Sequence, residues 1–190
     1  MTSRGAYAKG IAKRDEILSV ALDVVATHGY RRASVREIAD AVGLSQAGLL
    51  HYFDSKDELF TAVLRKRDEV DAALIVDDPL AGLLRIVSHN AEVPGLVQLY
   101  AQLSVAAADP SHRAHEFFTE RYKRLRTSLT AALSAAQLDG SLRSNFDPAS
   151  TATSLIAATD GLQTQFLLDP SVDMAGELRT LLDDLRSPDA

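Results

Sequence analysis

The stretch SVREIADAVGLSQAGLLHYF, residues 34–53, decides the fold, because it reads as two short helices joined by a tight turn. An S-x-x-E capping box beginning at Ser34 starts the first helix. Gly43 permits a left-handed turn, and Ser45 can cap a second helix that ends near Phe53. The stretch therefore has the layout of a DNA-binding helix-turn-helix.

The second helix of this pair has one buried and one outward face. At about 100° per residue, Leu49 and Phe53 share the face that must be buried. The other face carries small, apolar, amide and imidazole groups and no acid: Gln46, Ala47, Leu50 and His51. Because DNA repels carboxylates, this composition suits a helix in a major groove, where Gln46 can bond an adenine edge and Ala47 and Leu50 can touch a thymine methyl group.

Residues beside this face are placed to hold DNA phosphates and so to orient the pair of helices: Ser34, Arg36, Tyr52 and Lys56. Ser45 completes the predicted DNA-binding set. The alternative is a helical corner of a core that binds nothing. Charge favours DNA, because residues 1–67 hold 11 Lys/Arg and 8 Asp/Glu, a net of +3, whereas residues 68–190 hold 9 and 18, a net of −9.

The rest of the 190-residue chain also reads as helical, so the sequence predicts an all-α protein of about nine helices with no sheet. Residues 1–10 are small, Gly-containing and basic, which predicts a flexible arm. Residues 11–56 then form the helix-turn-helix domain, and residues 57–190 form a helical body. Two capping boxes, at Ser34 and Ser55, mark helix starts in the first domain.

From Arg14 to Phe60 the chain resembles the TetR family of bacterial one-component transcription regulators. The resemblance rests on RDEILSVALDVVATHGY, residues 14–30, and SVREIADAVGLSQAGLLHYFDSKDELF, residues 34–60. It implies that the third helix enters the major groove and that a fourth helix links the DNA head to a ligand-binding body. It assigns base contacts to Gln46, Ala47 and Leu50 or His51, and backbone contacts to Ser34, Tyr52 and Lys56.

Two positions depart from the family pattern. Many relatives carry Tyr where this chain has Leu50, and Thr or Ser where it has Gly48. Losing both hydroxyls leaves fewer polar contacts, so the operator sequence of relatives does not transfer to this chain. Gly48 is also expected to loosen the recognition helix by about 1 kcal/mol relative to Ala.

The last two predicted helices each offer an apolar surface. Residues 148–169 have a second stripe of small residues that would let another helix approach closely, and the final helix has one leucine-rich stripe. The pattern alone leaves a monomeric core as an equal alternative. The resemblance implies that these helices form a four-helix dimer interface, which predicts these interface residues: Ala157, Gly161, Leu168, Leu178 and Leu182.

Family resemblance also implies an unidentified small-molecule effector that favours a different spacing of the two DNA heads. A cavity among the fourth to eighth helices would be lined by apolar groups and scattered polar ones, for which a plain core role is equally compatible. The candidates are His89, Tyr100, Ser104, Phe118, Tyr122 and Gln163. The chain has no Trp and only 6% aromatic residues, so its composition does not indicate an aromatic cage that stacks on a ligand.

Several functional classes are excluded or disfavoured. The chain has no cysteine, which excludes disulfides and thiolate sites. His112 and His115 lack a visible third ligand, and no Gly-rich phosphate loop or Ser/His/Asp motif occurs, so we expect no metal, no cofactor and no enzyme. No apolar run approaches about 20 residues, which predicts a cytoplasmic, nucleoid-associated protein with no membrane partner.

The sequence therefore predicts a homodimeric transcription regulator, a repressor that binds a palindromic operator in double-stranded DNA and is released by a small molecule. The alternative from another class is a helical small-molecule-binding or adaptor protein whose helix-turn-helix no longer reads DNA. The net charge of −6 and the hydroxyl-poor third helix favour that alternative. Salt-dependent DNA binding separates the two.

Overall fold

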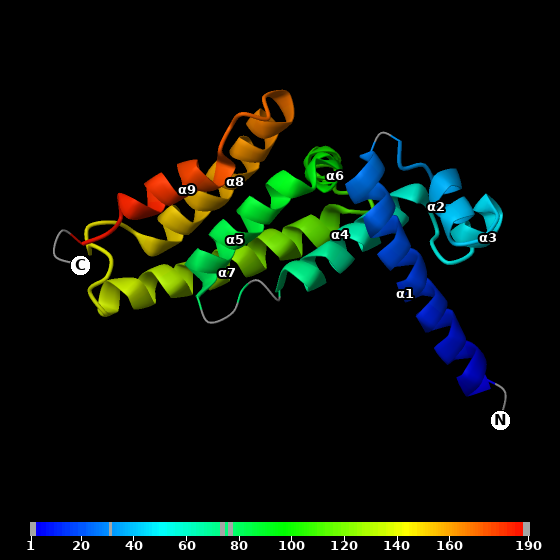
Figure 1. Ribbon diagram of the computed structural model, residues 1–190. Coiled ribbons are helices and arrows are strands. Elements are labelled where there is room, and N and C mark those ends of the chain that lie inside the picture. Colours follow the sequence, from blue (N-terminus) through cyan, green and yellow to red (C-terminus); the bar gives the residue numbers. More distant parts are fainter. Residues whose placement is uncertain (1–2, 31, 73–74, 76–77, 188–190) are drawn as a thin grey trace. The chain divides into compact units, whose positions relative to one another are not determined.

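The computed structural model of the protein describes residues 3–30, 32–72, 75 and 78–187 (Figure 1). In this part of the chain it has nine α-helices and no strand, which confirms the all-α prediction. The helices are α1 Ser3–His28, α2 Val35–Ala41, α3 Gln46–Leu50, α4 Lys56–Ala72, α5 Pro79–Glu92, α6 Pro94–Ala106, α7 His115–Leu138, α8 Pro148–Leu168 and α9 Met174–Asp183. No helix within these residues is long and apolar enough to cross a membrane.

The helices group into two compact units. Unit 1 comprises Met1–Val70 and Val93–His115, and unit 2 comprises Asp71–Glu92 and Glu116–Ala190. This division differs from the expected boundary between residues 56 and 57, because α6 groups with the N-terminal helices. The reason lies at Gly95, where a Cβ atom would overlap the carbonyl oxygen of Val25 on α1. Only glycine allows this close approach of α6 to α1.

The first helix starts earlier than the sequence predicts. α1 begins at Ser3, so most of the expected flexible arm continues the helix, and residues 1 and 2 lie outside the described residues. Alanine and lysine in this stretch favour helix, and each interior glycine opposes it by only about 1 kcal/mol. The inner face of α1 is buried through Ile17, Ala21 and Val25, as its spacing predicts.

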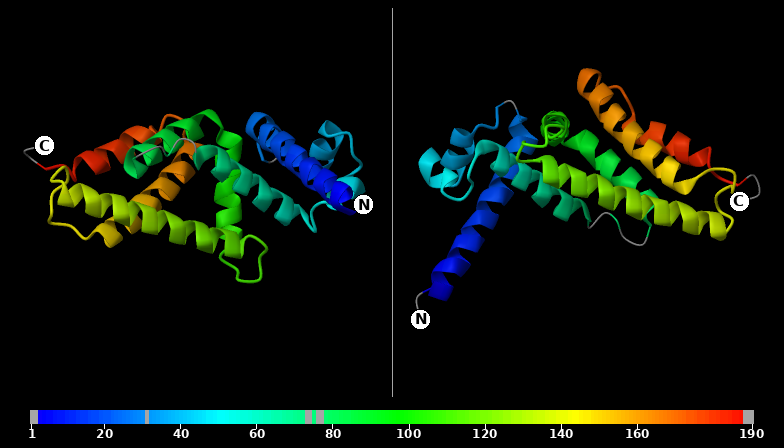
Figure 2. Two further views of the ribbon diagram at one scale, coloured as in Figure 1. Left: turned by 90° about the horizontal axis from the view of Figure 1, so that it is seen from below. Right: turned by 180° about the vertical axis from the view of Figure 1, so that it is seen from behind.

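In unit 2, α9 packs against both α5 and α8, and Figures 1 and 2 show α8 and α9 side by side. α8 begins as predicted, with the Asp147 carboxylate accepting a hydrogen bond from the Ser150 N–H (2.7 Å). α9 begins at Met174. Asp173 caps it, because the Ser171 hydroxyl donates instead to Asp169 (2.7 Å).

Candidate DNA-binding site

The turn between α2 and α3 is fixed by local hydrogen bonds. The Ser34 hydroxyl oxygen accepts from the Glu37 N–H (3.1 Å) and starts α2. At the other end Gly43 has a φ of +69°, and the Leu44 N–H donates to the Ala39 carbonyl (2.8 Å). This is a Schellman ending, in which a left-handed glycine lets the chain reverse while the last carbonyls stay satisfied. The predicted helix-turn-helix is confirmed.

α3 is short and capped. The Ser45 hydroxyl oxygen accepts from the Gly48 N–H (3.0 Å), and the helix ends at Leu50, before the predicted end near Phe53. Leu49 and Phe53 are buried as predicted. Because this helix has only five residues, its orientation depends on the buried pair and on the cap.

The face of α3 that points away from the core is exposed to solvent. We call it the α3 outward face, and it consists of Gln46, Ala47, Leu50 and the C-cap His51. Leu50 is 39% exposed, which is high for a leucine side chain. No charged residue occurs from Ala41 to Phe53. The structure thus confirms the expected exposure of this face, while its contacts with DNA remain a proposal.

The other predicted DNA-binding residues lie on neighbouring segments: Ser34 and Arg36 at the start of α2, Ser45 just before α3, Tyr52 just after it and Lys56 at the start of α4. Ser34, Arg36, Ser45 and Lys56 are exposed, and Tyr52 is half-buried. The Lys56 ammonium lies 5.8 Å from the Tyr30 ring centroid and 5.5 Å from that of Phe60, which places this cation beside two aromatic rings. Burial, with the Asp57 charge beside it, raises the pKa of Tyr30, so its ring stays neutral. Arg36 lies 3.8 Å from the Asp40 carboxylate.

Arg14 on α1 is a positioning residue that the sequence reasoning missed. Its guanidinium donates to the Tyr52 carbonyl, lies 3.2 Å from the Glu58 carboxylate and sits 4.2 Å from the Phe53 ring centroid. It therefore connects α1 to the segment between α3 and α4. Its sequence position could have indicated this role, because Arg14 lies three residues before the buried Ile17 and therefore on the same side of α1.

Both predicted capping boxes are only half formed. Each serine caps its helix, but neither glutamate returns to that serine's N–H. The Glu37 carboxylate instead lies 2.7 Å from Nδ1 of His28, and Glu58 accepts from the Asp54 N–H (2.6 Å). For Glu37, the imidazole of His28 on α1 replaces the N–H of Ser34 as the partner. For Glu58, the N–H of Asp54, one residue before Ser55, replaces the N–H of Ser55.

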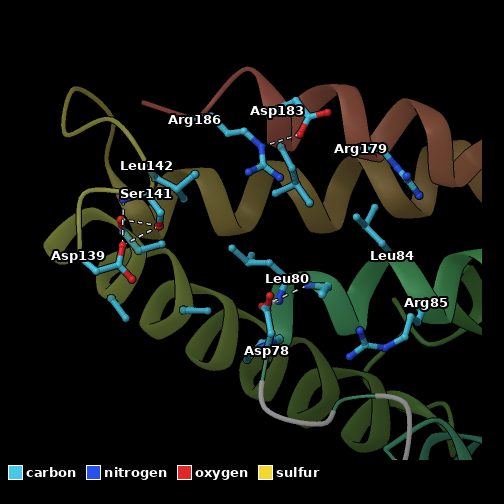
Figure 3. Close-up of a pocket in the computed structure, with 16 residues that line it drawn as sticks. Asp78, Leu80, Leu84, Arg85, Asp139, Ser141, Leu142, Arg179, Asp183 and Arg186 are labelled. Atoms are coloured by element: carbon cyan, nitrogen blue, oxygen red, sulfur yellow. Dashed lines mark hydrogen bonds and ion pairs between the residues drawn. The ribbon is translucent and has the colours of Figure 1, made fainter. Parts of the chain in front are cut away.

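The candidate effector residues fall in both units. Tyr100 and Ser104 belong to unit 1, and the other four belong to unit 2: His89, Phe118, Tyr122 and Gln163. The Tyr122 hydroxyl donates to Asp160 (2.6 Å), and His89 lies 3.4 Å from the Glu92 carboxylate. None of the six lines the unit 2 pocket shown in Figure 3.

The candidate interface residues also divide. Ala157, Gly161 and Leu168 on α8 are exposed, and Leu168 is 83% exposed. With Thr164 they form a charge-free strip, which we call the α8 outward face. Leu178 and Leu182 are instead buried inside the protomer, so placing them in an interface was wrong. Met174, Leu178 and Leu182 of α9 are buried within unit 2, where α9 packs against α5 and α8, whereas Leu181 is 43% exposed.

Two family models match the chain. "Bacterial regulatory proteins, tetR family" matches residues 17–63, and "BetI-type transcriptional repressor, C-terminal" matches residues 95–185. The transcriptional repressor KstR2 of Rhodococcus jostii is 28% identical over 151 residues, which cover 71% of this chain and 70% of that protein. Both models describe families of transcription regulators, and this relative is a transcriptional repressor. Because these are not enzyme families, the prediction that the protein is not an enzyme is confirmed.

Solved structures share the fold over nearly the whole chain. A TetR transcription regulator from Haloarcula marismortui aligns with a TM-score of 0.72 at 21% identity, covering 92% of this chain and 96% of that one. A putative transcriptional regulator from Saccharomonospora viridis in complex with choline aligns with a TM-score of 0.69 at 24% identity, covering 90% and 93%. With a capped helix-turn-helix and matches to both family models, the chain belongs to the TetR family of DNA-binding transcription regulators.

Proposed function

We propose that the protein is a repressor that binds a palindromic operator as a homodimer and leaves it when a small molecule binds. The observation that carries the proposal is the α3 outward face, which is exposed, uncharged and held by the Ser45 cap. Two such faces related by a two-fold axis would read half-sites about 34–36 Å apart, hence a palindrome. Operator binding would place the protein on the nucleoid.

Within residues 11–56 the contacts divide into two kinds. Gln46, Ala47, Leu50 and His51 would meet base edges in the major groove, because they are the exposed side chains of α3. The cationic and hydroxyl groups around them would hold the sugar–phosphate backbone: Ser34, Arg36, Ser45, Tyr52 and Lys56. The Lys56 ammonium is the strongest of these candidates, because it is exposed and forms no ion pair with the residues that the structure describes.

The α8 outward face supports the homodimer. Its four residues follow one another at intervals of about one turn along a 21-residue helix and carry no charge. At Gly161 an added Cβ atom would have no other atom of the protomer within 4 Å, so the helix surface is open at this position. A second copy of α8 could therefore approach closely along this strip.

The test of DNA reading starts with selection of bound fragments from the organism's genome. On the selected operator, Gln46→Ala should cost about 1–3 kcal/mol mainly at one base pair of each half-site. Lys56→Ala should weaken binding to all sequences alike and reduce the salt slope by about 1. Lys123→Ala, which removes an exposed cation on α7, is the matched control and should change neither.

Salt then separates the regulator from the adaptor alternative. Affinity of a protein that neutralises many phosphates falls steeply between about 50 and 200 mM salt, because bound cations are released from DNA. A flat response, or a sequence preference that Gln46→Ala leaves unchanged, would contradict the proposed reading face.

For the effector, we propose that Gln163 on α8 is one of its contacts. The side chain is 5% exposed, and its carbonyl oxygen Oε1 is buried without a hydrogen-bond partner. Asp160, one turn earlier on α8, accepts a hydrogen bond from Tyr122 of α7, so polar groups from two helices meet in this region. An unpaired buried acceptor favours an effector that carries a hydrogen-bond donor.

Replacing this amide tests the assignment. Gln163→Met keeps the side-chain length and removes the unpaired acceptor, so the ligand-free protein should gain about 1–3 kcal/mol in free energy of unfolding. Choline, whose hydroxyl can donate and which the S. viridis structure contains, is one probe for a thermal-shift measurement. A donor-bearing effector should bind Gln163→Met at least about tenfold more weakly; equal binding would remove Gln163 from the site.

A further inference from the structure

Unit 2 contains a pocket apart from all six candidate effector residues. It has a volume of about 770 Å³ and lies among the start of α5, the last turns of α7 and α9 (Figure 3). This volume is in the range of small-molecule sites. All of its lining residues belong to unit 2, where α5 and α9 pack together, and the segment after α7 adds Asp139, Ser141 and Leu142.

The inner part of the pocket is apolar. α5 contributes Leu80 and Leu84, α9 contributes Leu182, and α7 contributes small side chains that leave room, including Ala132 and Ala136. Leu80, Leu84 and Ala136 are only partly buried by the core beneath them. Covering apolar area of this kind with a hydrocarbon chain removes it from water and so favours binding.

Carboxylates at the rim are already engaged. Asp78 accepts two backbone N–H bonds at the start of α5 (2.8 and 3.2 Å), and Asp139 accepts from the N–H and hydroxyl of Ser141 (2.9 and 2.6 Å). The bonds from Ser141 lower the pKa of Asp139, so it stays ionised and satisfied. The third, Asp183, lies 2.8 Å from the Arg186 Nε.

One cation at the rim is not engaged in this way. Arg179 is exposed and has no hydrogen bond or ion pair with the residues that the structure describes. It lies one turn of α9 before Asp183, and Arg186 follows just after the end of that helix. Figure 3 shows all three residues at the edge of the pocket. The charge available to a ligand is therefore a guanidinium, next to an apolar floor.

We propose that this pocket binds an amphipathic monocarboxylate, such as a medium-chain fatty acid. Its carboxylate pairs with the Arg179 guanidinium, whose planar donors match two carboxylate oxygens. Its hydrocarbon chain lies on the leucine and alanine floor between α5, α7 and α9. The site is separate from the proposed effector contact at Gln163 and does not depend on DNA binding.

Calorimetric titration of the full chain, without DNA, tests the proposal with sodium decanoate as the probe. We expect one decanoate bound per chain and no binding of decyltrimethylammonium, which has the same chain and the opposite charge. Arg179→Gln should weaken decanoate binding at least about tenfold, the usual scale for loss of a charge-assisted pair. Arg124→Gln, which removes an exposed cation of α7 outside the pocket, should change it less than twofold.

A second variant tests where the hydrocarbon chain of decanoate lies. Ala135 lines the pocket and is exposed, so Ala135→Trp should fill the space without disturbing the core and should abolish binding. Circular dichroism checks that each variant is folded. The proposal fails if decanoate does not bind at millimolar concentration, if the cationic analogue binds equally well, or if either pocket variant binds like the unaltered chain. Gln163→Met should leave decanoate binding unchanged, which distinguishes this site from the effector contact.

Discussion

The α3 outward face and the α8 outward face are both exposed and both free of charged side chains, yet their surroundings differ. The first covers a five-residue helix in a region with a net charge of +3, beside Lys56. The second runs over Ala157 to Leu168, about 17 Å of helix, in a region with a net charge of −9. DNA is attracted to the first region and repelled from the second. We therefore propose DNA as the partner of the first face and a second copy of this chain as the partner of the second.

The largest effect should come from placing a charge on the α8 outward face. Gly161→Asp fits the protomer, because nothing lies within 4 Å of a Cβ at that position. In a symmetric dimer it buries two carboxylates, each costing about 3–5 kcal/mol if unpaired, which raises the dimer Kd more than about 100-fold. Sedimentation equilibrium measures this change.

The control for that variant is Ala131→Asp, an exposed site on α7, which should remain dimeric. The monomer made by Gly161→Asp should keep its affinity for a single half-site and lose the extra affinity for the full operator. A dimer of unchanged mass would move the interface to another surface.

The next largest effect should come from the same kind of change on the α3 outward face. Leu50→Glu places a carboxylate in the negatively charged major groove, so operator affinity should fall about 30–100-fold, or roughly 2–3 kcal/mol, while the mass of the dimer stays the same. Leu50→Gln keeps the size without the charge and should lose much less. If both variants bound DNA equally, Leu50 would lie outside the groove.

A smaller effect should follow from removing a helix cap. Ser45→Ala removes the acceptor for the Gly48 N–H and should lower the free energy of unfolding by about 1 kcal/mol, with a similar loss in DNA affinity. Asp147→Ala removes the corresponding cap of α8. It should lower stability by a similar amount and leave DNA affinity per dimer unchanged. Chemical denaturation and operator titration measure the two quantities.

The helix-turn-helix could be predicted because its signals are local. The serine caps, the left-handed Gly43 and the spacing of Leu49 and Phe53 all lie within 20 residues of one another in the sequence. The exposure of Gln46 and Leu50 follows directly from that spacing.

What could not be predicted depends on distant segments. Periodicity shows that one face of α9 is buried but not what covers it, so Leu178 was placed in an interface although α5 and α8 cover it. Gly95 resembles an ordinary helix start in the sequence, and only the approach of α1 shows why it is required. Glu37 was assigned to its own cap, whereas its carboxylate lies 2.7 Å from Nδ1 of His28 on α1. The pocket at Arg179 likewise combines residues from three separate helices.

The smallest effects concern two glycines that can each be changed to alanine. In α3, a Cβ at Gly48 would lie 3.2 Å from the Ser45 hydroxyl oxygen, which is exposed and can shift. The gain in helix preference, about 1 kcal/mol, should therefore leave Gly48→Ala more stable by about 0.5 kcal/mol. In α8, Gly161→Ala meets nothing within the protomer and should stabilise the monomer by up to about 1 kcal/mol.

The two alanine variants then differ in what the added methyl group meets outside the protomer. Gly48 is partly buried behind the α3 outward face, so DNA affinity should change less than the stability does. On the α8 outward face, two symmetry-related methyl groups would oppose a close helix pair, and overpacking costs about 1–3 kcal/mol. Gly161→Ala should therefore stabilise the monomer and weaken the dimer, as seen by unfolding at high dilution and by sedimentation. If the dimer became tighter instead, the two α8 helices would pair at an ordinary distance, and Gly161 would not be the point of contact.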